Sequence, residues 1–310
     1  MLLQTLLLAG GLVLLTIGAD FLVRGAISVA NRFGLPPLLI GLTVVGFGTS
    51  MPELLVSMQA ALSGAPAIAI GNVVGSNTAN ILLILGVSAA ISPIAAKIPN
   101  LGRDLVMMLV AAAVMLGLGF AGRVGLWSGL AMFLGLAAYL VYVFLADRTR
   151  PLDQEDGVDL KIRLSGWREA VFLVGGLAGL FIGAHLLITS ATEIARTFGI
   201  SEAVIGLTIV AVGTSLPELA TSVVAAIRGH AEVALGNVVG SNIFNILGIL
   251  GLTAIVTPVP IDASMASFDI PLMVAVSLAL ALLLTWAGRI GRAPGFAMVA
   301  AYSGYVWWLL

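Results

Sequence analysis

The sequence contains no cysteine, and only 9% of its 310 residues are charged. The absence of cysteine excludes disulfide bonds, thiolate metal sites and catalysis by a thiol. Soluble domains contain about 25% charged residues, so the low charge content argues against a soluble protein. The net charge is −1 and there is no basic stretch, so nothing in the composition indicates a nucleic-acid partner.

Apolar residues make up 60% of the sequence and recur in long runs from end to end. An α-helix needs about 20 apolar residues to cross a bilayer, whereas a membrane β-barrel shows alternating segments of about ten residues. The fold class is therefore predicted to be an all-α polytopic membrane protein. The first run has no basic segment or cleavage site before it, so we interpret it as a membrane span rather than a signal peptide.

The apolar runs predict ten membrane spans. They cover residues 2–23, 38–61, 67–90, 104–121, 124–145, 167–190, 204–227, 233–256, 268–287 and 294–310. The only long polar stretch lies between the fifth and sixth spans. We therefore expect a first five-helix unit at 1–146, a solvated cytoplasmic linker at 147–166 and a second five-helix unit at 167–310.

The basic residues predict the orientation. In this arrangement twelve of the 14 basic residues lie on one side of the membrane, and only Arg123 and Arg196 lie on the other. Basic residues accumulate on the cytoplasmic side. We therefore expect both termini outside and the linker inside.

A long-range repeat relates the two units. The segment Gly-Asn-Val-Val-Gly-Ser-Asn at 71–77 recurs unchanged at 236–242, and Gly-Thr-Ser-x-Pro-Glu at 48–53 recurs at 213–218. Both offsets are 165 positions, and the repeated motifs occupy 41–86 and 206–251. Because each unit has five spans, the second copy is expected to lie inverted in the membrane. Inverted repeats with interrupted helices are typical of alternating-access transporters, with the site near the bilayer midplane.

One carboxylate stands alone in each copy. Glu53 is the only charged residue between Phe33 and Ala96, and Glu218 is alone between Ala203 and Ile227. A carboxylate at membrane depth costs about 2.5–3.5 kcal/mol on insertion scales. No basic residue is near either one in the sequence, so a cation from solution is the simplest partner.

Other oxygen-bearing residues surround the two glutamates. Pro52 and Pro217 are expected to break their spans and to free backbone carbonyl oxygens. The predicted metal-binding residues are Thr49, Ser50, Glu53, Ser76, Asn80, Thr214, Ser215, Glu218, Ser241 and Asn245. These hard oxygen ligands suit Na⁺ and Ca²⁺ and argue against Zn²⁺ or Cu²⁺. Two carboxylates balance one Ca²⁺ or two Na⁺, so the ions can exchange.

Several motif residues also have structural interpretations. Ser50-x-x-Glu53 and Ser215-x-x-Glu218 fit a helix-capping box, although a glutamate is an expensive cap inside a bilayer. The Gly-x-x-x-Gly patterns at 71–75 and 236–240 favour close helix packing. Asp20 and Arg24 are expected to form a helix-end pair, and His185 is expected to be a hydrogen-bonded core residue.

The paired motifs resemble the α-repeats of the sodium/calcium exchanger family, within the cation/Ca²⁺ antiporter superfamily. The resemblance covers nearly the whole chain, and the short linker is similar to that of prokaryotic members, which implies a prokaryotic plasma membrane. It implies that Glu53 and Glu218 are central carboxylates shared by Ca²⁺ and Na⁺, lined by Thr49, Ser50, Thr214 and Ser215. Ser76 and Ser241 would serve flanking Na⁺ sites, and Asn80 and Asn245 would complete the centre. The first and sixth spans would slide as a gate.

One departure from the family concerns Asn80 and Asn245, where some relatives carry aspartate. It leaves stoichiometry and the use of K⁺ or H⁺ open and makes K⁺ co-transport less expected. The preferred function is a Na⁺/Ca²⁺ antiporter without covalent chemistry, without a cofactor and without a required protein partner. The alternatives are a Ca²⁺/H⁺ antiporter, a passive cation channel and a non-transporting membrane scaffold.

Overall fold

The computed structural model describes residues 2–95, 98–148, 164–199 and 211–309, which are almost entirely helical. The first half of the chain contains α1 (Leu2–Phe33), α2 (Pro37–Ile40), η1 (Gly41–Val45), α3 (Gly46–Thr49), α4 (Met51–Leu62), α5 (Pro66–Ala79), η2 (Asn80–Leu85), α6 (Gly86–Ile91), β1 (Ile94–Ala95), α7 (Leu101–Ala121), β2 (Arg123–Val124) and α8 (Leu126–Arg148). The segments η1 and η2 are π-helical.

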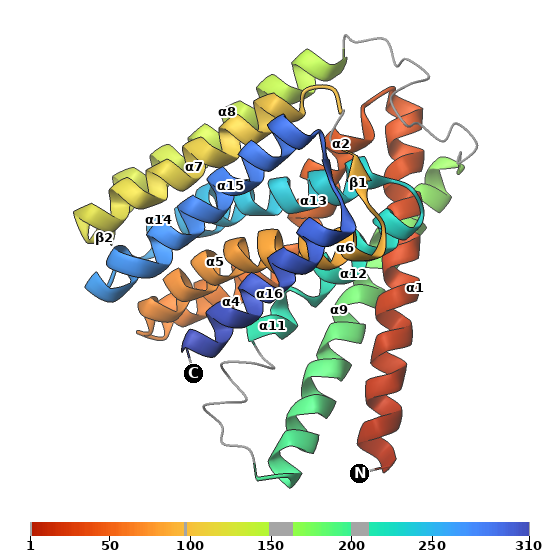
Figure 1. Ribbon diagram of the computed structural model, residues 1–310, viewed down its shortest axis with the longest axis horizontal. Helices are drawn as coiled ribbons and strands as arrows, with labels where there is room; N and C mark the ends of the chain where they lie inside the picture. Colours follow the sequence, from red (N-terminus) through yellow and green to blue (C-terminus); the bar gives the residue numbers. More distant parts are fainter. Residues whose placement is uncertain (1, 96–97, 149–163, 200–210, 310) are drawn as a thin grey trace.

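The second half contains α9 (Gly166–Thr197), α11 (Ala211–Thr214), α12 (Leu216–Ile227), α13 (Ala231–Ile243), the π-helical η5 (Phe244–Leu250), α14 (Gly251–Val256), β3 (Val259–Pro260), the π-helical η6 (Met265–Asp269), α15 (Ile270–Ala287), β4 (Arg289–Ile290) and α16 (Arg292–Leu309). The helices form an apolar bundle, and the long helices α1 and α9 lie side by side along one flank of it (Figure 1).

Seven helices in the described residues are long and apolar enough to cross a membrane, and an eighth span results if α2–α3 and α4 count as one bent helix. This content confirms the prediction of a polytopic helical membrane protein. The seventh predicted span is described only from residue 211, where α12 is a shorter apolar helix. The tenth corresponds to α16, which begins with Arg292 and carries Tyr and Trp side chains, and it is not among the seven.

The helices that carry the repeated motifs are the most buried of these spans. Pro66–Ile91 is 72% buried and Ala231–Val256 is 89% buried, against 33% for α1 and 22% for α9. The repeated motifs therefore lie in the core of the bundle, while α1 and α9 expose most of their surface. An apolar helix with so much exposed surface fits a lipid environment.

The helices α1 and α9 pack antiparallel through glycine. A Cβ on Gly11 would lie 2.8 Å from the Gly183 carbonyl oxygen, and one on Gly18 would lie 2.8 Å from that of Gly176. By the 165-residue offset, Gly176 is the equivalent of Gly11, and Gly183 is the equivalent of Gly18. Gly11 therefore packs against the equivalent of Gly18, and Gly18 packs against the equivalent of Gly11. Only hydrogen at these positions lets the two backbones approach so closely.

Both helices extend beyond the predicted spans, which end at residues 23 and 190. Their ends are set by Gly34 (φ +65°) and Gly199 (φ +74°), which adopt the left-handed conformation that terminates helices. Asp20 and Arg24, at the end of the predicted first span, do not end α1 because they have partners. Asp20 pairs with Arg24 at 2.9 Å and also with Arg228, but α1 continues to Phe33, so this pair lies within the helix and not at its end as predicted.

Short strand pairs connect the loops of the two halves. β1 pairs antiparallel with β4, with Ile94 opposite Ile290, and β2 pairs antiparallel with β3, with Val124 opposite Val259. Each pair takes one strand from each half. The all-α prediction did not include these bridges, which are only two residues long.

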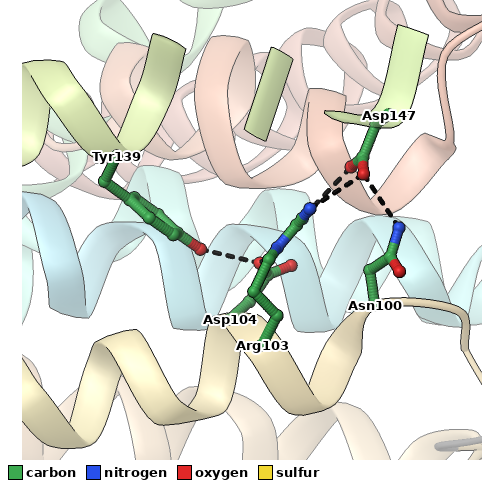
Figure 2. Close-up of polar contacts among 5 residues, drawn as sticks. All are labelled: Asn100, Arg103, Asp104, Tyr139 and Asp147. Carbon is green, nitrogen blue, oxygen red and sulfur yellow. Dashed lines mark hydrogen bonds and ion pairs between the residues drawn. The ribbon is translucent and has the colours of Figure 1, made fainter. Parts of the chain in front are cut away.

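A polar cluster joins the start of α7 to the end of α8 (Figure 2). Arg103 donates to Asp104 at 2.7 Å and to Asp147 at 2.8 Å, Asn100 donates to Asp147 at 2.8 Å, and Tyr139 donates to Asp104 at 2.7 Å. Asp147 is buried. Asp147, the first residue of the predicted linker, therefore lies within α8, where Arg103 of α7 neutralises its carboxylate. Residues 149–163 of the predicted linker lie outside the described residues.

Two other interpretations have mixed outcomes. His185, expected in the core, is exposed, because it lies outside the glycine face that α9 packs on α1. Close packing is confirmed for the second Gly-x-x-x-Gly pattern, where a Cβ on Gly240 would lie 2.6 Å from the Leu42 Cα. For Gly75 in the first pattern, no described atom lies within 4 Å of an added Cβ.

Candidate ion-binding site

The two glutamates lie at matching interruptions of their spans. Between α3 and α4, Ser50 departs from helical geometry (φ −83°, ψ 8°), and the two helices bend by 44° there. Ser215 has nearly the same conformation (φ −90°, ψ 9°) between α11 and α12. Pro52 and Pro217 follow in the first turns of α4 and α12. The predicted break at each proline is confirmed, and each glutamate lies in the first turn of the helix after it.

Crosswise hydrogen bonds bring the two breaks together. Ser50 Oγ donates to Glu218 Oε1 at 3.0 Å, and Ser215 Oγ donates to Glu53 Oε1 at 3.1 Å. Each serine thus serves the glutamate of the opposite half, which places the two carboxylates next to each other inside the bundle. Neither serine makes a side-chain capping bond to its own helix, so the capping-box interpretation is wrong.

Both carboxylates are buried, with Glu53 1% exposed and Glu218 2% exposed. Their second oxygens, Glu53 Oε2 and Glu218 Oε2, have no hydrogen-bond partner among the described residues. A buried ionised carboxylate without a compensating charge is strongly disfavoured. The geometry therefore leaves negative charge and free acceptor oxygens at one place, which a cation can neutralise.

Two amide oxygens add to this acceptor set. Asn80 Oδ1 and Asn245 Oδ1 are also buried without a hydrogen-bond partner among the described residues. The Asn80 Nδ2 atom donates to Asn242 Oδ1 at 3.0 Å, and the Asn245 Nδ2 atom donates to Asn77 Oδ1 at 3.3 Å. These bonds again join opposite halves.

The remaining predicted ligands are buried as well. Thr49 Oγ1 donates to Asn237 Oδ1 at 3.2 Å across the two halves. Ser241 Oγ has no partner among the described residues, and Ser76 and Thr214 are buried on α5 and α11. No group of three or more His, Cys, Asp or Glu side chains gathers in the described ranges. Within the described residues, the charge of the candidate site thus comes from the two carboxylates of Glu53 and Glu218.

Asn72 and Asn237 fix the turns that carry the glutamates, a role that the sequence did not reveal. Asn72 Nδ2 donates to the Glu53 carbonyl oxygen at 3.1 Å and to Ser57 Oγ at 2.9 Å. Asn237 Nδ2 makes the equivalent bonds to the Glu218 carbonyl oxygen at 3.3 Å and to Ser222 Oγ at 2.9 Å. The signal was present in the sequence, since buried amides in apolar helices need partners.

Paired carboxylates and amide oxygens at two helix breaks inside an apolar bundle are typical of membrane transporters that carry cations. The sequence model of the family described as sodium/calcium exchanger protein matches residues 3–145 and 169–310, which is nearly the whole chain. The chain belongs to this family. It is therefore a transporter of the cation antiporter class and not an enzyme.

Individual relatives agree with this assignment. The chain is 40% identical to the putative antiporter CaxA of Alkalimonas amylolytica, with 98% of each chain covered. It is 35% identical to the sodium/calcium exchanger MaX1 of Methanosarcina acetivorans, with 97% of each chain covered. A solved structure of the sodium-calcium exchanger NCX_Mj, soaked with 2.5 mM Na⁺ and 0.1 mM Ca²⁺, matches with a TM-score of 0.84, 34% identity and 97% of each chain covered.

Proposed function

We propose that this protein exchanges Na⁺ for Ca²⁺ across the membrane by alternating access, with Glu53 and Glu218 as the shared ligands. The observation that carries the proposal is the crosswise pairing of Ser50 with Glu218 and of Ser215 with Glu53, in which the second oxygen of each buried carboxylate has no hydrogen-bond partner in the described part of the chain. Two negative charges balance one Ca²⁺ or two Na⁺. Similarity to proteins named sodium/calcium exchangers supports this choice of ions.

The oxygen count fits the larger ion. Calcium takes about six to eight oxygen ligands. The two carboxylates and the amide oxygens of Asn80 and Asn245 offer six, and the hydroxyl groups or backbone carbonyls near the breaks would complete the shell. The ligand set that we propose is Thr49, Ser50, Glu53, Ser76, Asn80, Thr214, Ser215, Glu218, Ser241 and Asn245, with Ser76 and Ser241 serving flanking Na⁺ sites.

The architecture that we propose is ten spans in two inverted five-helix repeats, at 1–146 and 167–310. In the antiparallel contact of α1 with α9, Gly11 packs against Gly183 and Gly18 packs against Gly176. This reciprocal pairing supports a pseudo-twofold axis that relates the two halves. The crosswise bonds at the site follow the same exchange. We further propose that both termini are outside a prokaryotic plasma membrane, with the linker in the cytoplasm and Na⁺ and Ca²⁺ as the substrates.

Ion flux in proteoliposomes tests this function. Purified protein is reconstituted, a Na⁺ gradient is imposed with pH clamped on both sides, and ⁴⁵Ca²⁺ uptake is measured. We expect uptake that depends on Na⁺ on the opposite side and that stops when the Na⁺ gradient is removed. Glu53→Gln protein in parallel vesicles measures uptake that does not pass through the site.

Other outcomes would identify the alternatives. Uptake that ignores Na⁺ and follows a pH gradient would indicate a Ca²⁺/H⁺ antiporter and would contradict the proposed coupling. Ca²⁺ flux without any counter-ion, together with unitary currents, would indicate a channel. The absence of flux under all these gradients would indicate a membrane scaffold.

A further inference from the structure

The amides of Asn80 and Asn245 can serve a cation through only one of their two polar ends. Their Oδ1 atoms are acceptors, whereas their Nδ2 groups carry hydrogens and repel a cation. Both Oδ1 atoms are without partners in the described part of the chain, and both Nδ2 groups are used in bonds to the opposite half. Some part of the protein must therefore determine which end of each amide faces the carboxylates.

The next residues in this chain of bonds are Asn242 and Asn77. Asn242 Oδ1 accepts from Asn80 at 3.0 Å, and Asn77 Oδ1 accepts from Asn245 at 3.3 Å. If Asn242 or Asn77 turned its amide over, two NH₂ groups would face each other inside the bundle. The orientation of these two asparagines therefore decides the orientation of the site amides.

Two methionine sulfurs hold Asn77 and Asn242 in the required orientation. Asn77 Nδ2 donates to Met273 Sδ at 3.6 Å, and Asn242 Nδ2 donates to Met108 Sδ at 3.9 Å. A thioether sulfur can accept a hydrogen bond but cannot donate one. An NH₂ group can therefore face the sulfur favourably, whereas a carbonyl oxygen cannot.

The two methionines are matched across the halves. Met108 lies on α7 and Met273 on α15, both side chains are buried, and their positions differ by 165, as do those of Asn77 and Asn242. Asn242 Nδ2 donates a second hydrogen bond, to the Asn77 carbonyl oxygen at 3.4 Å, and this bond favours the same orientation of the amide. The same sulfur–amide–amide sequence thus occurs twice, each time crossing between halves.

We propose that Met108 and Met273 are positioning residues for ion binding, and that each sulfur acts through one asparagine to aim the carbonyl oxygen of Asn80 or Asn245 at the bound cation. The inference rests on the proposed function for the identity of the site. A purely packing role for the methionines makes a different prediction. Leucine, which has a similar volume, would then replace them without effect on the ions.

The test uses full-length Met108→Leu, Met273→Leu and double-variant proteins. Two quantities are measured: the Ca²⁺ concentration for half-maximal uptake in vesicles, and the rise in thermal unfolding midpoint that Ca²⁺ gives the purified protein. We expect about a threefold higher half-maximal Ca²⁺ concentration for each single variant. The reason is that a hydrogen bond to sulfur is weak, so its net free energy lies at the low end of the range for neutral hydrogen bonds. The double variant should reach about tenfold, with the maximal rate nearly unchanged.

Matched variants separate orientation from packing. Met115→Leu changes a buried methionine on the same helix α7 whose sulfur accepts no hydrogen bond in the described residues, and it should leave both quantities unchanged. Met108→Gln restores an acceptor at a similar distance along the side chain, and it should return the half-maximal concentration toward that of the wild type.

Two results would overturn the inference alone. One is a folded double leucine variant with wild-type Ca²⁺ dependence, in vesicles where wild-type uptake is present and Glu53→Gln abolishes it. The other is a Met108→Gln protein that behaves like Met108→Leu. A wild-type protein that shows neither Ca²⁺ uptake nor stabilisation by Ca²⁺ would overturn both the inference and the proposed function.

Discussion

Glu53 and Glu218 carry the charge that the surrounding residues leave uncompensated. Each receives a hydrogen bond from a serine of the other half, and its second oxygen has no hydrogen-bond partner among the described residues. Such a group is unfavourable until a cation arrives, so binding energy and charge neutralisation are obtained together. Under the proposed function, this coupling favours a state in which one ion or another occupies the site.

Replacement of either carboxylate by its amide should abolish exchange. Glu53→Gln or Glu218→Gln leaves one negative charge, which cannot balance Ca²⁺ or two Na⁺, so ion affinity should fall on the order of a hundredfold or more. ⁴⁵Ca²⁺ uptake in vesicles measures this loss. Without ions, the unfolding midpoint should be equal to or above that of the wild type, because a buried charge has been removed. Retained exchange in a folded variant would mean that the site lies elsewhere.

Removal of a crosswise hydroxyl should weaken binding without abolishing it. Ser50→Ala deletes the bond to Glu218, and a lost hydrogen bond to a charged group is worth about 1.5–3 kcal/mol, or roughly tenfold or more in affinity. Titration of uptake against Ca²⁺ measures the change. Ser88→Ala is the matched control, because Ser88 is buried but donates at 2.8 Å to the Ile84 carbonyl oxygen of its own helix region. Equal effects in the two variants would contradict the crosswise role.

At the scale of residues, the sequence predicts the two charged side chains better than it predicts the neutral side chains that position them. Glu53 and Glu218 stand out because no other charge is near them in the sequence. Asn72 and Asn237 were visible in the repeated motif, but their role depends on the folded distance to the glutamate turns. Met108 and Met273 look like ordinary core residues, because nothing in an apolar helix distinguishes a sulfur that accepts a hydrogen bond from one that only packs.

At the scale of elements, α1 and α9 form a pair that is held together by close backbone contact and is exposed along much of its remaining surface. Side-chain interlocking is limited where glycine faces backbone, so such an interface is compatible with sliding. This geometry is consistent with the family expectation that the first and sixth spans act as a gate.

An added methyl group in this interface should separate the pair. Gly18→Ala would place a Cβ 2.7 Å from the Leu180 nitrogen and 2.8 Å from the Gly176 carbonyl oxygen, so backbone has to move. Overpacking of this kind costs about 1–3 kcal/mol. The expected result is a lower thermal unfolding midpoint in detergent together with slower exchange.

Gly10→Ala on the same helix is the control. An added Cβ there meets no described atom within 4 Å, and alanine favours the helix over glycine by roughly 0.5–1 kcal/mol. Its midpoint should equal or exceed that of the wild type. A Gly18→Ala protein as stable and active as Gly10→Ala would show that the α1–α9 contact tolerates separation.

The positions of the elements follow from apolar runs and from proline, but their exact ends do not. The breaks at Pro52 and Pro217 were predictable because proline removes a backbone donor. The extra turns of α1 were not, because Asp20 gains Arg228 as a second partner beside Arg24 only in the folded chain. The π-helical segments η2 and η5 have no signal in a periodic pattern, although each contains a candidate ligand asparagine.

At the scale of the whole molecule, several contacts between the halves occur as exchanged pairs. The glycine contacts of α1 with α9, the serine–glutamate bonds and the asparagine bonds each occur twice. In the second contact, each residue of the first is replaced by its equivalent in the other half. The 165-residue offset predicts that two similar units exist, but it cannot say which faces meet. That information requires the fold, and it is what brings two isolated glutamates into one site.

The distribution of basic residues predicts the orientation of the protein in the membrane. Because the sequence contains no cysteine, this orientation can be tested by labelling single introduced cysteines. Arg123 and Arg292 are both exposed and are predicted to lie on opposite sides. In intact cells, a membrane-impermeant maleimide should label Arg123→Cys, whereas Arg292→Cys should react only after permeabilisation. The cysteine-free parent measures background labelling, and Ca²⁺ uptake by each variant shows that it is folded. Labelling of both sites from outside would contradict the odd number of spans, the fifth to the ninth, that is expected between Arg123 and Arg292. Labelling of Arg292→Cys alone would invert the proposed orientation.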